Sequence, residues 1–145
     1  MNADRTLEAA LATLDGSLPF HEIVRTLLSA GVEYYHVDYA GKSLSFYSEA
    51  GAVSIAPILF EDLPPIARDF DAEELRAAIL DSQRDGQKFR VFCHRAMNAG
   101  VAGYFTFLRG QRVTYFGRQG EQHTEWFPGA TPSVQGQNPR PADQR

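Results

Sequence analysis

Apolar residues at the spacing of one helix face mark two short segments of this chain. In each segment they fall at positions i, i+3, i+4, i+7 and i+8, the pattern of an α-helix with one buried side. The first set is Phe20, Ile23, Val24, Leu27 and Leu28, and the second, 69 residues later, is Phe89, Phe92, Cys93, Ala96 and Met97. A glycine follows each segment, where a left-handed residue commonly ends a helix. We therefore predict two equivalent helices.

Each predicted helix is followed by residues that favour β-structure. Aromatic and β-branched side chains are concentrated there, and short turns containing glycine separate the runs. This pattern predicts a meander of antiparallel strands in each half. The predicted strands are 32–39, 43–47 and 52–56 in the first half, and 101–108, 112–116 and 121–126 in the second.

A further helix is predicted at the start of each half. In the first half Leu7, Leu11 and Leu14 indicate its inner face, and Asp15-Gly16 indicates its end. In the second half Asp71 and Glu74 have the spacing of a capping box. The inner positions there are Leu75, Ala78, Ile79 and Ser82. These two helices correspond only if one residue is inserted.

The two halves together form an internal repeat, which decides the architecture. We predict a single α+β domain over residues 1–127, built from pseudo-repeats at about 3–60 and 71–127. The strands are expected to join into one antiparallel or mixed sheet packed against the helices. The prolines and scarce apolar residues of 128–145 predict a disordered tail.

Composition and charge narrow the classes of partner. The chain has 145 residues and a formal net charge of −4, which opposes nucleic-acid binding because that binding relies on clustered Lys and Arg. A single cysteine permits no internal disulfide and fits a reducing cytoplasm. There is no signal-peptide pattern, and no apolar run reaches the roughly 18 to 20 residues of a membrane span. We expect a soluble cytoplasmic protein with no membrane or nucleic-acid partner.

The second repeat resembles a known family of small bacterial and prophage proteins. The residues that carry the likeness are Phe89-x-x-Phe92-Cys93-x-x-Ala96-Met97-x-Ala99-Gly100-Val101-x-x-Tyr104 and Val113-x-Tyr115-x-Gly117-x-x-Gly120-Glu121. They are similar to the YdfO-like family, a domain of unknown function whose members are sometimes labelled phage envelope proteins. The likeness is strongest over 85–128 and extends over 5–128. It implies an α+β fold and supplies no catalytic residues.

Two His–acid pairs are the candidate catalytic groups. His36 and Asp38 alternate along one predicted strand, and His123 and Glu125 alternate along another, so each pair shares one face of its strand. Imidazole and carboxylate together serve in metal binding and in acid–base catalysis. The alternative is a solvated sheet face. Cys93 precedes a histidine but takes a core position of its helix, so we predict packing rather than nucleophilic catalysis.

The remaining candidates concern binding. Arg109, Arg112 and Arg118 cluster around the second hairpin and could hold an anion together with Tyr35 and Tyr104, or form a solvated rim. Phe105 and Phe107 share one face of a strand that is apolar on both sides. We predict that the linker around 58–60 covers them; the alternative is an exposed patch for a partner or second subunit.

Three functional hypotheses follow from these residues. The first is a small binding or regulatory protein with an unknown protein partner or self-association. The second is a metal-dependent or acid–base enzyme that uses both His–acid pairs. The third is a binder of small anionic ligands between the two repeats. No catalytic motif is identified, a non-enzymatic role is favoured, and no metal or cofactor is predicted.

Overall fold

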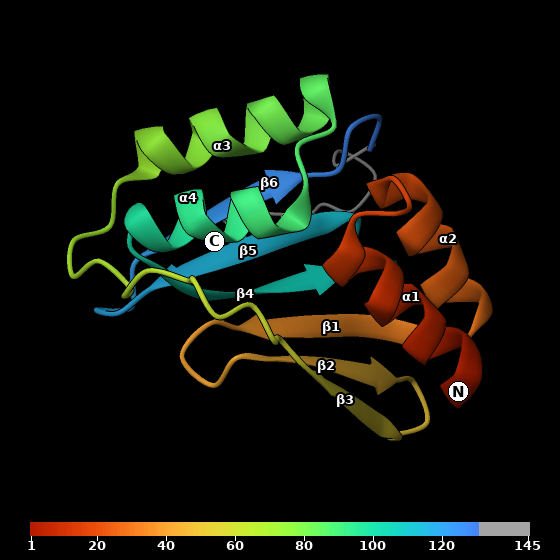
Figure 1. Cartoon of the computed structure of the whole chain (residues 1–145). Helices are drawn as coiled ribbons and strands as arrows, with labels where there is room; N and C mark the ends of the chain where they lie inside the picture. Colours follow the sequence, from red (N-terminus) through yellow and green to blue (C-terminus); the bar gives the residue numbers. More distant parts are fainter. Residues whose placement is uncertain (131–145) are drawn as a thin grey trace.

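The computed structural model describes residues 1–130 and contains two copies of a helix–helix–three-strand unit (Figure 1). In the first copy these elements are α1 (Ala3–Asp15), α2 (Phe20–Ser29), β1 (Val32–Asp38), β2 (Ser43–Ser48) and β3 (Val53–Pro57). In the second they are α3 (Ala72–Asp85), α4 (Phe89–Asn98), β4 (Val101–Phe107), β5 (Arg112–Gly117) and β6 (Gln122–Trp126). The prediction of an α+β fold built from a duplicated unit is confirmed. The predicted disordered tail, apart from residues 128–130, lies outside the described residues.

All six strands form one antiparallel sheet in the order β3-β2-β1-β4-β5-β6. The first strands of the two copies, β1 and β4, are neighbours at its centre. His36 lies directly opposite Phe105, which is its own counterpart in the repeat. A pseudo-twofold axis therefore passes between these two residues and relates one half of the sheet to the other.

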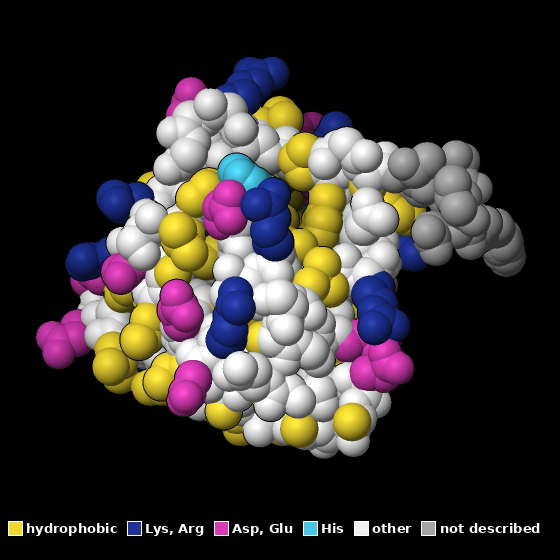
Figure 2. Space-filling model, turned by 90° about the vertical axis from the view of Figure 1, so that its right-hand side faces the viewer, with side chains coloured by type: hydrophobic (Ala, Val, Ile, Leu, Met, Phe, Trp, Pro, Cys, Tyr) yellow, Lys and Arg dark blue, Asp and Glu magenta, His cyan; other side chains and the backbone are white. Residues whose placement is uncertain are grey.

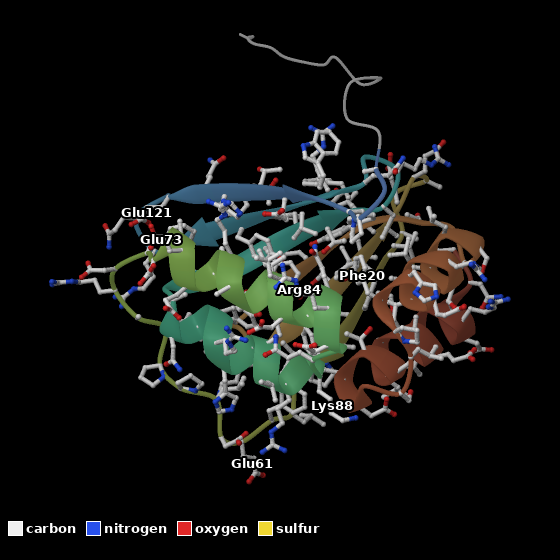
Figure 3. All side chains as sticks on the ribbon, turned by 90° about the horizontal axis from the view of Figure 1, so that it is seen from above. Phe20, Glu61, Glu73, Arg84, Lys88 and Glu121 are labelled. Atoms are coloured by element: carbon white, nitrogen blue, oxygen red, sulfur yellow. The ribbon has the colours of Figure 1, made fainter. Side chains whose placement is uncertain are left out.

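All four helices lie on the same side of the sheet (Figures 1 and 3). The sheet residues that face them alternate with residues that face away. The helix-facing residues in the core are Val37, Tyr35, Tyr39, Leu44, Phe46, Ala56, Tyr104, Val113 and Tyr115. From here on we call this side the helix face and the opposite side the open face.

The predicted inner face of α1 is wrong for two of its three leucines, since only Leu14 packs against the core. Leu7 and Leu11 are 51% and 54% exposed, and the buried residues are Thr6, Ala9, Ala10 and Ala12. The small side chains allow α1 to lie close to α4 and β3, which larger leucines would prevent. Hydrophobic side chains accordingly remain visible on the side of the molecule formed by α1 and α2 (Figure 2).

The other helices follow their sequence patterns more closely. Leu75, Ala78 and Ile79 of α3 are buried, and Asp71 caps this helix by accepting a hydrogen bond from the Glu74 N–H. In α4 the buried residues are the predicted Phe92, Cys93, Ala96 and Met97. In α2 only part of the predicted stripe is buried, since Phe20 and Leu28 are exposed.

The linker between the repeats packs on the helix face, which corrects the prediction that it covers Phe105 and Phe107. Its side chains Phe60, Leu63, Ile66 and Phe70 lie against the buried core. Its backbone is fixed to α4, because the Ala67 N–H donates to the Met97 carbonyl. Figure 3 shows Glu61 on the helix side, far from the open face. Within residues 1–130, no helix is long and apolar enough to cross a membrane.

The helix layer departs from the pseudo-twofold symmetry. α1 packs on α4, but the equivalent approach of α3 to α2 is wider. α1 also packs on β3, whereas α3 lies less closely over β6. The layer is consequently closed on the α1–α4 side and incomplete between α2 and α3 (Figure 1).

Candidate functional site

The two predicted His–acid pairs lie on opposite faces of the sheet. His36 and Asp38 are on the open face, where the His36 ring stacks on Phe105 with 4.3 Å between ring centroids. His123 and Glu125 are on the helix face of β6, with β4 and β5 between the two pairs. The sheet therefore separates the pairs, and they cannot act together on one substrate.

Each pair has its own local surroundings. Burial lowers the pKa of His36, and the nearby Asp38 carboxylate opposes this shift. Asp38 itself accepts a hydrogen bond from the Gly41 N–H and so holds the β1–β2 turn. His123 Nε2 lies 2.9 Å from Glu125 Oε1. Among residues 1–130, no three metal-ligating side chains come together as a potential metal site.

The three arginines of the second hairpin do not converge. Arg109 pairs with Glu49 at 2.8 Å between Nη1 and Oε2, and the Arg112 guanidinium lies 4.3 Å from the Trp126 ring centroid. Arg118 donates to the Ile66 carbonyl. Each therefore has a partner of its own in a different place, and the arrangement does not form a single anion site.

Cys93 is a core residue, as predicted. Its side chain is buried in α4, and this burial raises the pKa of the thiol to about 12. At neutral pH the thiolate population is negligible, and thiolate is the nucleophilic form.

A cavity of about 790 Å³ occupies the incomplete side of the helix layer. Its floor is the helix face of the sheet, and its walls are α2, the end of α3 and the start of α4. Figure 3 looks onto this region: Phe20 of α2 and Arg84 near the end of α3 lie on its two sides, with Lys88 after α3. The cavity therefore lies between the two repeats.

The floor of the cavity is rich in hydroxyl groups. Tyr35, Tyr104, Tyr115 and Thr106 all line it. Strand register places Tyr35 beside Thr106 on one row, and Tyr104 beside Tyr115 on the next. The floor thus receives side chains from both repeats, including the two tyrosines that the sequence suggested as lining.

Burial keeps these phenols protonated. It raises the pKa of Tyr35 to about 12, and the interaction with the neighbouring Thr106 hydroxyl opposes this rise. The pKa values of Tyr104 and Tyr115 are also raised, first by burial and then by neighbouring acidic groups. At neutral pH all three tyrosines are uncharged hydrogen-bond donors and acceptors.

Thr106 is the unusual member of the floor. Its side chain is fully buried, and its hydroxyl makes no hydrogen bond of normal length and angle within the described residues. Leaving a buried hydroxyl without a partner costs about 1–3 kcal/mol. The oxygen itself is covered, so a group in the cavity can reach it only when the side chains over it shift.

The walls are mainly apolar and carry little charge. Ile23 and Val24 of α2, Ile79 of α3, Phe92 of α4 and Val113 of β5 supply hydrophobic surface. Phe20 and Phe127 meet edge to face, with ring centroids 5.2 Å apart, and join α2 to the segment after β6.

Two lining side chains, Lys88 and Glu125, are charged at neutral pH, and His21 is a third titratable group. Sequence reasoning proposed Glu125 in another role and missed Thr106. The alternation of β4 could have revealed Thr106, because it has the same parity as Tyr104.

No protein-family model matches the chain, and no curated protein matches it. The geometry of the cavity and of the sheet therefore carries the functional argument.

Proposed function

We propose that this protein is a binding protein whose ligand is a small amphipathic molecule without net charge, held in the cavity between the repeats. The observation that carries this proposal is the cavity itself, whose mainly apolar walls enclose a floor of hydroxyl-bearing side chains from both repeats. The volume lies within the roughly 300–1,000 Å³ of small-molecule sites.

The lining indicates the chemistry of the ligand. Apolar walls favour a hydrocarbon or aromatic body, and neutral phenols in the floor favour hydroxyl or carbonyl groups. The single lysine and single glutamate balance each other, and none of the three hairpin arginines lines the cavity. An uncharged ligand is therefore favoured over the anionic ligand suggested by the sequence.

The placement of the candidate catalytic groups favours a binding role over catalysis. Catalysis needs an activated nucleophile or an acid–base group placed at the substrate. Cys93 is buried away as a protonated thiol, and the two His–acid pairs lie on different faces. The cavity supports recognition through shape and hydroxyl groups.

The proposal can be tested with N-phenyl-1-naphthylamine, an uncharged fluorescent probe that brightens in apolar sites. We expect saturable binding at one probe per chain. Val24→Trp places an indole in the cavity and should weaken binding about tenfold or more, since the site is then occupied. Val91→Trp is the matched control, because Val91 is exposed on α4. This variant should bind the probe like the native chain.

A second measurement examines Thr106 itself. In competition with the probe, 1-naphthol should bind about five- to tenfold more weakly to Thr106→Val than to the native chain, whereas 1-methylnaphthalene should show no difference. Equal probe binding by Val24→Trp and Val91→Trp would show that the cavity is not the site.

We also propose that the chain is related to the YdfO-like family, because residues 85–128 resemble that family. The structure of a member of that family should then have the same strand order and the same opening between the second and third helices.

A further inference from the structure

The open face of the sheet carries three rows of side chains defined by strand register. The first row is Val53, Tyr47, Tyr34, Phe107, Arg112 and Trp126. The second is Ile55, Ser45, His36, Phe105, Thr114 and Thr124, and the third is Pro57, Ser43, Asp38, Gly103, Phe116 and Gln122. All four helices and the linker lie on the other side (Figure 3). The rows therefore form a broad surface rich in aromatic groups.

The aromatic side chains on this face stack on one another. Tyr34 and Tyr47 are parallel, with ring centroids 4.8 Å apart, and Phe105 and Phe107 are parallel at 6.1 Å. Phe116 meets Phe105 edge to face. Stacking keeps each ring half-buried, but the outer surface of the whole group is available for contact. At the edge of the face Ile55 is 67% exposed.

We propose that this face binds a second copy of the same chain, to form a dimer in which two sheets pack face to face. The area is sufficient. Six strands spaced by about 4.8 Å and five to seven residues long give a flat area of about 500–600 Å² before side-chain relief is added. Two such faces together bury about 1,000–1,200 Å², which reaches the roughly 1,000 Å² in total that a specific interface needs and is smaller than the standard size of about 1,600 Å².

Charge favours a copy of this chain over a nucleic acid. The chain carries a net charge of −4, so two copies can approach best through a surface without net charge. The open face has that property, because its formal side-chain charges at neutral pH are those of Asp38 and Arg112. Single-stranded nucleic acid also stacks on aromatic groups, but it needs a track of cations for its phosphates. One arginine does not provide it.

The placement of the two charges suits a twofold interface. Asp38 lies one strand before Phe105 and on the third row, and Arg112 lies one strand after Phe105 and on the first row. Phe105 is thus midway between them. A twofold axis that lies between the two sheets and parallel to them, above Phe105 and at right angles to the line from Asp38 to Arg112, brings each Asp38 to the Arg112 of the other copy. The same axis places the two Phe105 rings together. The Asp38–Arg112 contact then occurs twice, and the contact between the two Phe105 rings lies on the axis.

The test is the mass of the full chain in solution, by light scattering after gel filtration and by sedimentation velocity from about 1 to 100 µM. One copy has a mass of 16.1 kDa, and we expect twice that value. Phe107→Lys should raise the dissociation constant about a hundredfold or more and leave single copies, because an aromatic anchor of the interface is lost twice. Phe107→Thr, which suits a strand, should act in the same direction.

Leu59→Lys is the matched control. Leu59 is 77% exposed but belongs to the linker, so this variant should remain a dimer. A native chain that has the mass of one copy at 100 µM overturns the proposal, as does a folded Phe107→Lys or Phe107→Thr that keeps the mass of two. The first of these results would assign the aromatic face to a different protein.

Discussion

Replacing Thr106 with valine should stabilise the ligand-free protein. Valine has nearly the shape of threonine but no hydroxyl, and the Thr106 hydroxyl is buried without a hydrogen bond of normal geometry. An unpaired buried hydroxyl costs about 1–3 kcal/mol, so its removal should raise the free energy of unfolding by about 1 kcal/mol. For a domain of this size, the melting temperature should rise by roughly 2–5 °C.

The assay is urea unfolding followed by far-ultraviolet circular dichroism, on protein refolded from urea so that no bound molecule is carried over. Thr6→Val is the matched control. Thr6 is equally buried, but its hydroxyl donates to the Asn2 carbonyl at 2.8 Å. This variant should lower the free energy of unfolding by about 1 kcal/mol. If Thr106→Val lowers it as much as Thr6→Val does, the Thr106 hydroxyl has a partner and the reasoning is refuted.

Three further predictions concern the frame around the site. Gly100→Ala should cost more than about 3 kcal/mol or prevent folding, because φ is +89° and a Cβ there overlaps the Asp69 carbonyl. Its counterpart Gly31→Ala, at φ +90°, meets the Met1 backbone only at a contact distance of 3.4 Å and should cost about 1–2 kcal/mol in urea unfolding. Native Cys93 should resist iodoacetamide at pH 8. The pKa of the Cys93 thiol is about 12 in the folded chain and roughly 8.5 in the unfolded chain. The contribution of this group to the free energy of unfolding should therefore be fully present below about pH 8.5 and should decline as the pH rises toward 12. Unfolding at several pH values will measure this decline. Asp71→Ala should cost about 1 kcal/mol through loss of the α3 cap, measured by thermal melting.

The sequence predicted the elements and the repeat well, because both depend on local patterns. The spacing of Phe89 to Met97 gave α4, and the glycines gave the helix ends. The inner face of α1 was missed because leucines are usually the buried residues of such a helix. Here the space between α1 and its neighbours admits only alanine and threonine. Space of this kind is a property of the assembled fold.

The candidate site was predictable only in part. Tyr35 and Tyr104 were assigned to a ligand site between the repeats, and they do line the cavity. The arginines placed with them do not, because each arginine side chain contacts a different neighbour away from the cavity. The separation of the two His–acid pairs depends on strand order and on the face each strand presents. Neither is visible in the spacing of residues along the chain.

The two proposed sites meet on one strand, and this permits a final prediction. Along β4, Tyr104 and Thr106 face the cavity, whereas Phe105 and Phe107 belong to the open face. β4 is held on both sides by β1 and β5, so a change on one face should not move the backbone that carries the other. Phe107→Lys should therefore bind N-phenyl-1-naphthylamine with native affinity as a single copy, and Val24→Trp should remain a dimer. A loss of probe binding in the folded Phe107→Lys variant would instead show that dimer formation shapes the cavity through β4.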